Sequence, residues 1–317
     1  MSESTDTSAT LSFRSADGPL AYVEQGSGPP LVFLHGGFVD HTMWDPQIPV
    51  FARDYRVIAP DARGHGASAN ATRPFRSADD LAALLRHLDA APAILVGLSM
   101  GGGIAVDTVL EHPEVVRAVV VSGVGTSEPV FEDPWTLDAF AAQQRALAAG
   151  DVEGWLAAFA RFAVGPRRAA GDVDPDVIRR LRDMALRTLS KHTADEPNHL
   201  VPVRNTWERA QDIRVPVVAV NGEADSPDHL RMAERLVNGV PGGRVTTVGG
   251  GHYPNMEDPQ GFNAALTAFL NSLDSLDSLD SLDALGPMNP LDPAESSESS
   301  ESSESSECSE CSESADS

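Results

Sequence analysis

Ser99 lies at the centre of Gly97-Leu98-Ser99-Met100-Gly101, a G-x-S-x-G pentapeptide that is typical of a nucleophile on a tight turn between a strand and a helix. The apolar run 93–96 before it predicts a short buried strand, and a helical pattern begins at Ile104. Glycine suits positions 97 and 101 because a Cβ at either would collide with neighbouring backbone. The turn would leave the serine hydroxyl above the sheet, beside the free N–H groups at the start of a helix.

A serine hydroxyl is a poor nucleophile at neutral pH and needs an adjacent base, for which histidine is best suited. The sequence has nine histidines, and His252 stands out because the glycines 249–251 precede it directly after the predicted strand 245–248. Such glycines allow a loop to turn back across the top of a sheet. We therefore predict that His252 is the base.

The acid that orients this base is expected at the junction after the preceding strand. Asp225 fits, because it follows the predicted strand 217–220 by a few residues. The order Ser99, Asp225, His252 predicts a catalytic triad. An alternative is that Asp225 caps the helix that begins near Pro227, a position for which Ser226 and Asp228 compete.

The oxyanion of an acyl-transfer reaction needs two hydrogen-bond donors. The predicted strand 31–34 ends in His35-Gly36-Gly37-Phe38, so we expect the backbone N–H groups of Gly37 and Met100 to serve. His35 is better suited to hold this loop than to act as a base. Candidate pocket residues are Phe38, Trp44 and Trp135, although ordinary core packing explains such aromatic residues at least as well.

Apolar strand candidates alternate with helical patterns through most of the chain, which predicts an α/β fold with a mostly parallel sheet between two helical layers. The exception is the interval between Val124 and Asp212, where only helical stretches occur. We predict a core of residues 11–124 and 213–271, with 125–212 inserted as a helical cap. Further helices are expected at 78–88, 104–112, 228–237 and 261–271.

The 317 residues carry a net charge of -24, unevenly distributed. Residues 271–317 contain 13 acidic and no basic side chains. Without a basic surface, nucleic-acid binding and attraction to anionic membranes are not expected. We predict that residues 272–317, with their Ser-Leu-Asp and Glu-Ser-Ser repeats, form a low-complexity, disordered tail.

No apolar stretch approaches the ~18 residues of a membrane span. The first ten residues are polar and predict a flexible N-terminus without a signal sequence, hence a cytoplasmic protein. Cys308 and Cys311 both lie in the acidic tail. Two ligands without a second pair would not close a zinc site, so they are best explained as replacements within the repeat.

From about residue 11 to 271, the sequence resembles the α/β-hydrolase fold superfamily. The resemblance is carried by His35-Gly36-Gly37, the segment 61–68, the pentapeptide around Ser99, Gly222-Glu223-Ala224-Asp225 and the segment 251–257. The segment 43–68 looks like the esterase, enol-lactonase and cofactor-free perhydrolase branches. Serine at position 99 separates the chain from the similar epoxide hydrolases and haloalkane dehalogenases, which carry aspartate there.

The resemblance implies a three-layer α/β-hydrolase fold and a serine hydrolase that cleaves a carboxylic ester or lactone of small to medium size. Neither a metal nor an organic cofactor is implied. Two alternatives stay open: the same triad used for C–C bond hydrolysis or perhydrolysis, and a non-catalytic member that binds a small ligand. The sequence indicates neither the substrate's acyl and alcohol groups nor the oligomeric state.

Overall fold

The computed structural model describes residues 9–193 and 195–284. The chain divides into two compact units, residues 1–272 and residues 273–317. The first unit contains the sheet and nearly all of the helices, and the described part of the second is helical. Most of the predicted flexible N-terminus lies outside the described residues. So does the acidic tail from residue 285 onwards, including Cys308 and Cys311.

Eight strands form one sheet, in the spatial order β1-β2-β4-β3-β5-β6-β7-β8. β2 is antiparallel to both of its neighbours. The other six strands, in the spatial order β4, β3, β5, β6, β7 and β8 that follows β2, run parallel to one another. The strands are β1 (Leu11–Ser15), β2 (Gly18–Gln25), β3 (Pro30–Leu34), β4 (Arg56–Pro60), β5 (Ala93–Leu98), β6 (Val116–Ser122), β7 (Val217–Gly222) and β8 (Arg244–Val248). The predicted mostly parallel α/β fold is confirmed.

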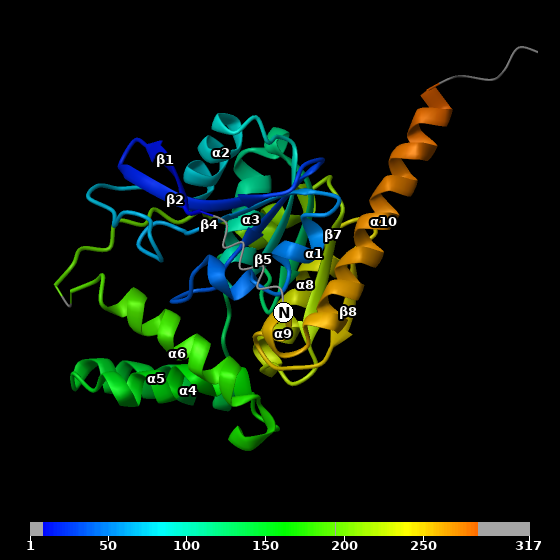
Figure 1. Cartoon of the computed structure of the whole chain (residues 1–317). Coiled ribbons are helices and arrows are strands. Elements are labelled where there is room, and N and C mark those ends of the chain that lie inside the picture. The colour runs from blue at the N-terminus through cyan, green and yellow to red at the C-terminus, as the bar shows by residue number, and fades with distance from the viewer. Residues whose placement is uncertain (1–8, 194, 285–317) are drawn as a thin grey trace, which may run out of the picture. The chain divides into compact units, whose positions relative to one another are not determined.

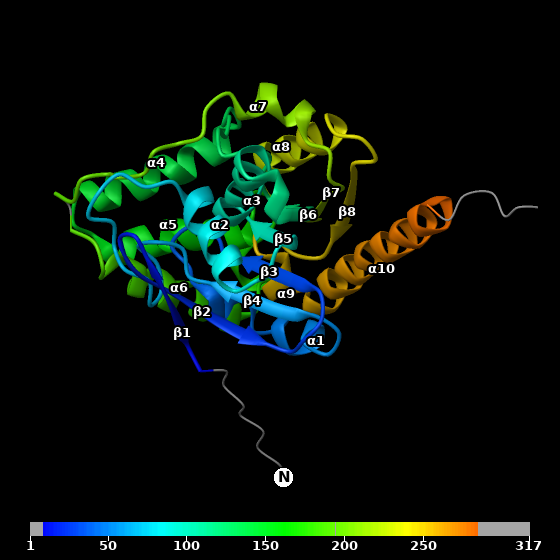
Figure 2. The same ribbon diagram turned by 90° about the horizontal axis from the view of Figure 1, so that it is seen from above.

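Helices cover both faces of this sheet, with α2, α3 and α8 on one face and α1 and the start of α10 on the other (Figure 2). The helices are α1 (Ile48–Phe51), α2 (Ser77–His87), α3 (Met100–Glu111), α4 (Pro134–Ala148), α5 (Val152–Val164), α6 (Pro175–Leu189), α7 (Thr206–Arg209), α8 (Pro227–Asn238), α9 (Pro254–Glu257) and α10 (Pro259–Ala284). Buried Val, Leu and Ala side chains from the strands and from α2, α3 and α8 form the main core.

The turn between β5 and α3 contains fewer residues than the helical pattern predicted. α3 begins at Met100 rather than at Ile104. Three glycines weaken the helical signal, because glycine has a low helix propensity. The structure needs them, since a Cβ on Gly97 would overlap the backbone of Gly101, and a Cβ on Gly101 would overlap the carbonyl oxygen of Leu34.

The last helix also differs from the prediction. We expected it to end at Asn271, yet α10 continues to Ala284 through the Ser-Leu-Asp repeats. A repeat of three residues does not keep leucine on one helix face, which is why the pattern did not predict a helix. No proline or glycine interrupts the sequence between Asn271 and Gly286, however, and leucine is a strong helix former.

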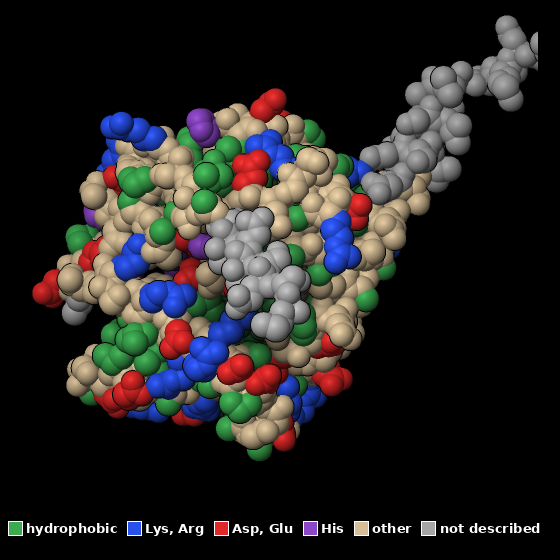
Figure 3. All heavy atoms as spheres, in the orientation of Figure 1, with side chains coloured by type: hydrophobic (Ala, Val, Ile, Leu, Met, Phe, Trp, Pro, Cys, Tyr) green, Lys and Arg blue, Asp and Glu red, His purple; other side chains and the backbone are tan. Residues whose placement is uncertain are grey.

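Between β6 and β7, the described residues contribute no strand to the sheet. This segment carries α4, α5, α6 and α7, and the first three lie together beyond the carboxyl ends of the strands (Figure 1). Charged side chains of both signs mix on their outer surface (Figure 3), including the ion pairs Arg182–Glu153 and Arg179–Asp176. We refer to α4, α5 and α6 as the cap helices.

No helix in the described part of the chain is long and apolar enough to cross a membrane.

The loop after β4 is anchored by a buried carboxylate. Asp61 accepts hydrogen bonds from the backbone and ring nitrogens of His41 and from the amide of Ala67, at 2.8 to 2.9 Å. Burial alone would raise the pKa of Asp61, but the hydrogen bond and charge of His41 lower that pKa to about 2. The carboxylate is therefore more stable in the folded than in the unfolded chain.

The substitution Asp61→Asn removes the charge of this carboxylate. It should lower the free energy of unfolding by about 2 kcal/mol near neutral pH. Because the pKa of Asp61 is lowered from 3.8, its contribution is present above that pH and is lost as the pH falls towards about 2. Urea unfolding at a series of pH values measures both effects. Asp54→Asn, at an exposed position, is the control. A difference between Asp61→Asn and wild type that does not shrink in acid would contradict this account.

Candidate functional site

Ser99 occupies the turn between β5 and α3 with φ 51° and ψ -116°, a conformation that costs energy for any residue other than glycine. The turn is held by hydrogen bonds from the Ser99 amide to the carbonyl of Ser122 (2.8 Å) and from the Gly103 amide to the carbonyl of Ser99 (3.0 Å). Within the described residues, the Ser99 hydroxyl has no hydrogen-bond partner. It lies on the wall of a cavity.

This cavity has a volume of about 160 Å³ and lies between the carboxyl ends of the strands and the cap helices. Ser99, Met100, Gly37 and Phe38 line it from the loops after β3 and β5, and His252 lines it from the loop after β8. Further lining residues come from the cap helices, namely Phe140 and Gln143 of α4 and Phe159 and Phe162 of α5. We call this space the cap cavity.

His252 and Asp225 form a buried hydrogen-bonded pair. The Nδ1 atom of His252 lies 2.9 Å from Oδ2 of Asp225, and both side chains are at most 5% exposed. Gly123, at the end of β6, makes room for them, because a Cβ there would come within 2.8 Å of both. The structure thus brings Asp225 to His252, and it places His252 and Ser99 on the wall of the same cavity.

Ser226 resolves the alternative role of Asp225. Ser226 is the N-cap of α8, and its hydroxyl accepts from the amide of His229. Asp225 therefore does not cap this helix. It accepts instead from the amide of Ser226 at 2.6 Å and from His252.

His229 is a site residue that the sequence analysis missed. Its Nδ1 atom lies 3.3 Å from Oδ1 of Asp225 and 2.7 Å from the Ser226 hydroxyl, and its ring lies 4.2 Å from that of His252. The sequence did contain a signal, because His229 follows the predicted acid by four residues. In the first turn of a helix, a residue at that spacing lies beside the earlier one.

His252 and His229 both contact the buried carboxylate of Asp225, and these contacts favour its ionised form. Burial would raise the pKa of Asp225, but the charges and hydrogen bonds of His252 and His229 hold that pKa well below its usual range. Burial and the charge of His252 lower the pKa of His229. Asp225 is therefore an anion across the pH range in which histidine titrates.

Gly37 and Met100, the predicted oxyanion donors, both line the cap cavity. Gly37 and Met100 lie side by side, since a Cβ on Gly37 would be 3.9 Å from that of Met100. No hydrogen bond satisfies either backbone N–H within the described residues. His35 holds the first of the two loops, because its Nδ1 bonds the carbonyl of Gly36 (2.7 Å) and its Nε2 accepts from the amide of Ala62 (2.9 Å).

The predicted pocket residues separate into two groups. Phe38 lines the cap cavity and packs edge-on against Trp155 at 4.7 Å. Trp44 and Trp135 are not among the residues that line it. Trp44 is fully buried against Phe33 and Phe262, so its assignment to the pocket is wrong. Trp135 lies on α4 and contacts Phe162 and the guanidinium of Arg161.

Asp225, His229 and His252 bring possible metal-ligand atoms within 4.8 Å of one another. The carboxylate of Asp225 already bonds to His252, and Nδ1 of His229 bonds to the Ser226 hydroxyl while lying 3.3 Å from that carboxylate. The donor set is therefore satisfied without an ion, and the absence of a metal requirement stays a prediction.

Comparison with known proteins agrees with this geometry. Residues 31–265 match the model of the alpha/beta hydrolase family. The 3-oxoadipate enol-lactonase 2 of Acinetobacter baylyi and the 2-(acetamidomethylene)succinate hydrolase of Mesorhizobium japonicum are each 28% identical to the chain, over 78% of its length and 90% of theirs. A solved structure, Est816, described as an N-acyl homoserine lactone degrading enzyme, is 26% identical and has a TM-score of 0.67. That match covers 82% of this chain and all of Est816.

The family match spans the parallel part of the sheet, from β3 to β8, and every candidate site residue, and the eight-stranded, mostly parallel sheet agrees with it. The chain belongs to the alpha/beta hydrolase family.

Proposed function

We propose that this protein is a serine hydrolase that cleaves a carboxylic ester or lactone of small to medium size. The observation that carries the proposal is the buried Asp225–His252 hydrogen bond on the wall of a cavity that also holds Ser99. The lactonase and hydrolase names of the relatives support the same reaction class.

In the proposed reaction, Ser99 Oγ attacks the substrate carbonyl carbon while His252 accepts the hydroxyl proton. Asp225 holds the imidazole in the required tautomer and stabilises its charged form. The negative charge that develops on the carbonyl oxygen is stabilised by the amides of Gly37 and Met100. Two observations support this assignment: both residues line the cap cavity, and neither amide has a hydrogen-bond partner within the described residues that would have to be displaced.

When the carbonyl re-forms, the bond to the leaving alkoxide breaks and His252 donates its proton to that oxygen. The product is an ester of Ser99 with the acyl group. Water then attacks this ester with His252 again as base, which releases the carboxylic acid and restores the Ser99 hydroxyl. The cap helices narrow the space above Ser99, so we infer that they select the substrate.

A fluorophosphonate probe should label the wild-type protein at Ser99, because the probe reacts only with an activated serine. Intact-protein mass spectrometry measures one added probe group, and peptide mapping locates it. Ser99→Ala should stay unlabelled. Absence of labelling in the wild type, or equal labelling of the variant, would overturn the serine hydrolase assignment and favour a protein that only binds a ligand.

Asp225→Asn should lower kcat for p-nitrophenyl acetate by about 10,000-fold, since asparagine favours the wrong histidine tautomer. Asp228→Asn is a matched control, because Asp228 is equally buried and follows Asp225 by only three residues. It binds the amides of Glu132 and Asp133 instead of a histidine. The control should retain turnover close to that of wild type. If the two variants lost activity equally, Asp225 would not be the acid.

A further inference from the structure

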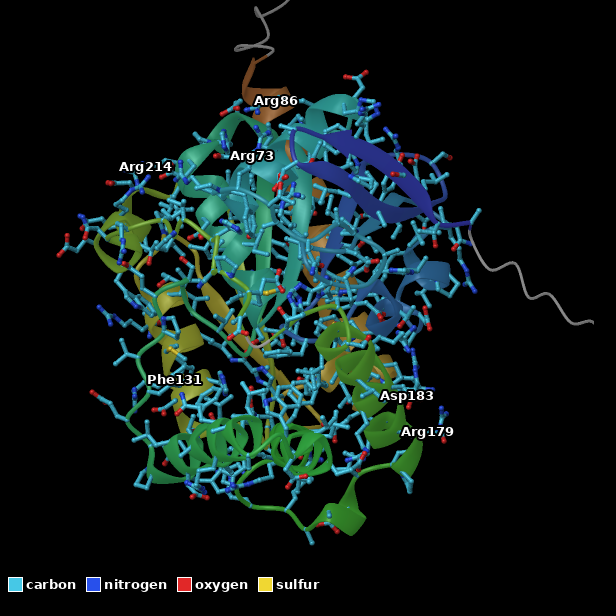
Figure 4. All side chains as sticks on the ribbon, turned by 90° about the vertical axis from the view of Figure 1, so that its left-hand side faces the viewer. Arg73, Arg86, Phe131, Arg179, Asp183 and Arg214 are labelled. Atoms are coloured by element: carbon cyan, nitrogen blue, oxygen red, sulfur yellow. The ribbon has the colours of Figure 1, made fainter. Side chains whose placement is uncertain are left out.

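A second cavity, of about 310 Å³, meets the cap cavity at Ser99, Met100 and His229. Its walls are largely apolar and include Ile104, Val124, Phe131, Val203 and Met232. Phe131 lies on the segment that leads from β6 into α4 (Figure 4). Nothing in the proposed reaction uses this space.

The second cavity runs along one face of α3. Met100, Gly103, Ile104 and Asp107 all line it, and their spacing of three and four residues places them on a single face of the helix. At 1.5 Å per residue, the distance along the helix from Ser99 to Asp107 is about 12 Å. The cavity is therefore an apolar channel with the candidate nucleophile at one end and a carboxylate further along.

Asp107 is buried, with 8% of its surface exposed. Its Oδ1 accepts a hydrogen bond from the hydroxyl of Ser127 at 2.6 Å, and among the described residues Ser127 is its only hydrogen-bond donor. Burial raises the pKa of Asp107 to about 6. A carboxylate has about four acceptor sites, so this side chain has unused capacity to accept a hydrogen bond from a ligand.

The charges at this end of the cavity favour a neutral ligand group. Arg76 lines the cavity together with Asp107 and is ion-paired with Glu111. Asp107 would repel a ligand carboxylate, and an ammonium group would lose its hydration in this largely apolar cavity. A hydroxyl group can donate to Asp107 without either penalty.

The position of His252 decides which part of the substrate each cavity receives. His252 must donate a proton to the leaving group, and it lines the cap cavity but is not among the residues that line the second one. The leaving alcohol therefore belongs under the cap, and the acyl chain extends away from His252 along α3.

We propose that the second cavity is an acyl-chain subsite for a medium-length apolar acyl group whose terminal hydroxyl donates a hydrogen bond to Asp107. This inference rests on the proposed hydrolase function and specifies its substrate class as esters of ω-hydroxy fatty acids.

The test compares kcat/KM for the p-nitrophenyl esters of ω-hydroxydecanoate and decanoate, whose chain length suits the channel. Wild type should prefer the hydroxylated ester about tenfold, the expected effect of one hydrogen bond to a charged group. Asp107→Leu should bring the ratio to one or below. Asp183→Leu, on α6 at the outer surface (Figure 4), is the matched control and should keep the wild-type ratio.

A second variant tests the channel without removing the carboxylate. Ile104→Trp should block the path along α3 and lower kcat/KM for decanoate much more than for acetate. It serves as the test if Asp107→Leu does not fold, as judged by circular dichroism.

Failure of this inference can be distinguished from failure of the proposed function. Wild type that hydrolyses the acetate ester but shows no preference for the hydroxylated chain would overturn the subsite alone. The subsite would also be overturned if Asp107→Leu kept the wild-type preference for the hydroxylated ester. An equal loss of kcat/KM on the decanoate and acetate esters in Ile104→Trp would overturn it as well. A wild-type protein that hydrolyses no ester and resists the fluorophosphonate would overturn the hydrolase function itself.

Discussion

The turn that carries Ser99 has no room for a side chain on either glycine that flanks it. A Cβ on Gly97 would overlap the backbone of Gly101, and one on Gly101 would overlap the end of β3. This close approach makes α3 begin immediately after β5, which sets the position of the Met100 amide and the direction of the helix. Both cavities share the first turn of α3, so their positions depend on the same contact.

Burial of Asp225 imposes a second constraint. A carboxylate that is 1% exposed must have its oxygen atoms satisfied by the protein, since water does not reach them. The amide of Ser226, His252 and His229 meet this need. The hydrogen bond from His252 stabilises the buried charge of Asp225 and also fixes the orientation of the His252 ring. One interaction therefore serves both the stability of the fold and the proposed chemistry.

The cap is joined directly to the loop that carries His252. The amide of His252 donates to the carbonyl of Phe162 on α5 (3.2 Å), and a Cβ on Gly251 would overlap the carbonyl of Ala163. Movement of α5 would therefore disturb the proposed base. The proposed reaction is assigned to residues at the ends of strands, whereas much of the cavity walls comes from the cap helices and from the segment 200–203.

The sequence by itself determined the strand and helix pattern, the glycine turn around Ser99, and the order in which Asp225 and His252 follow strand ends. These are local features, because hydrophobic period and glycine spacing depend on neighbouring residues. Only the tertiary structure decided that phenylalanines of the cap helices line the cavity that holds Ser99, that Trp44 is core rather than pocket, and that Ser99 and Asp107 line one cavity together with the segment 200–203. Each of these depends on which distant segments come into contact, and no local pattern in a single sequence records that.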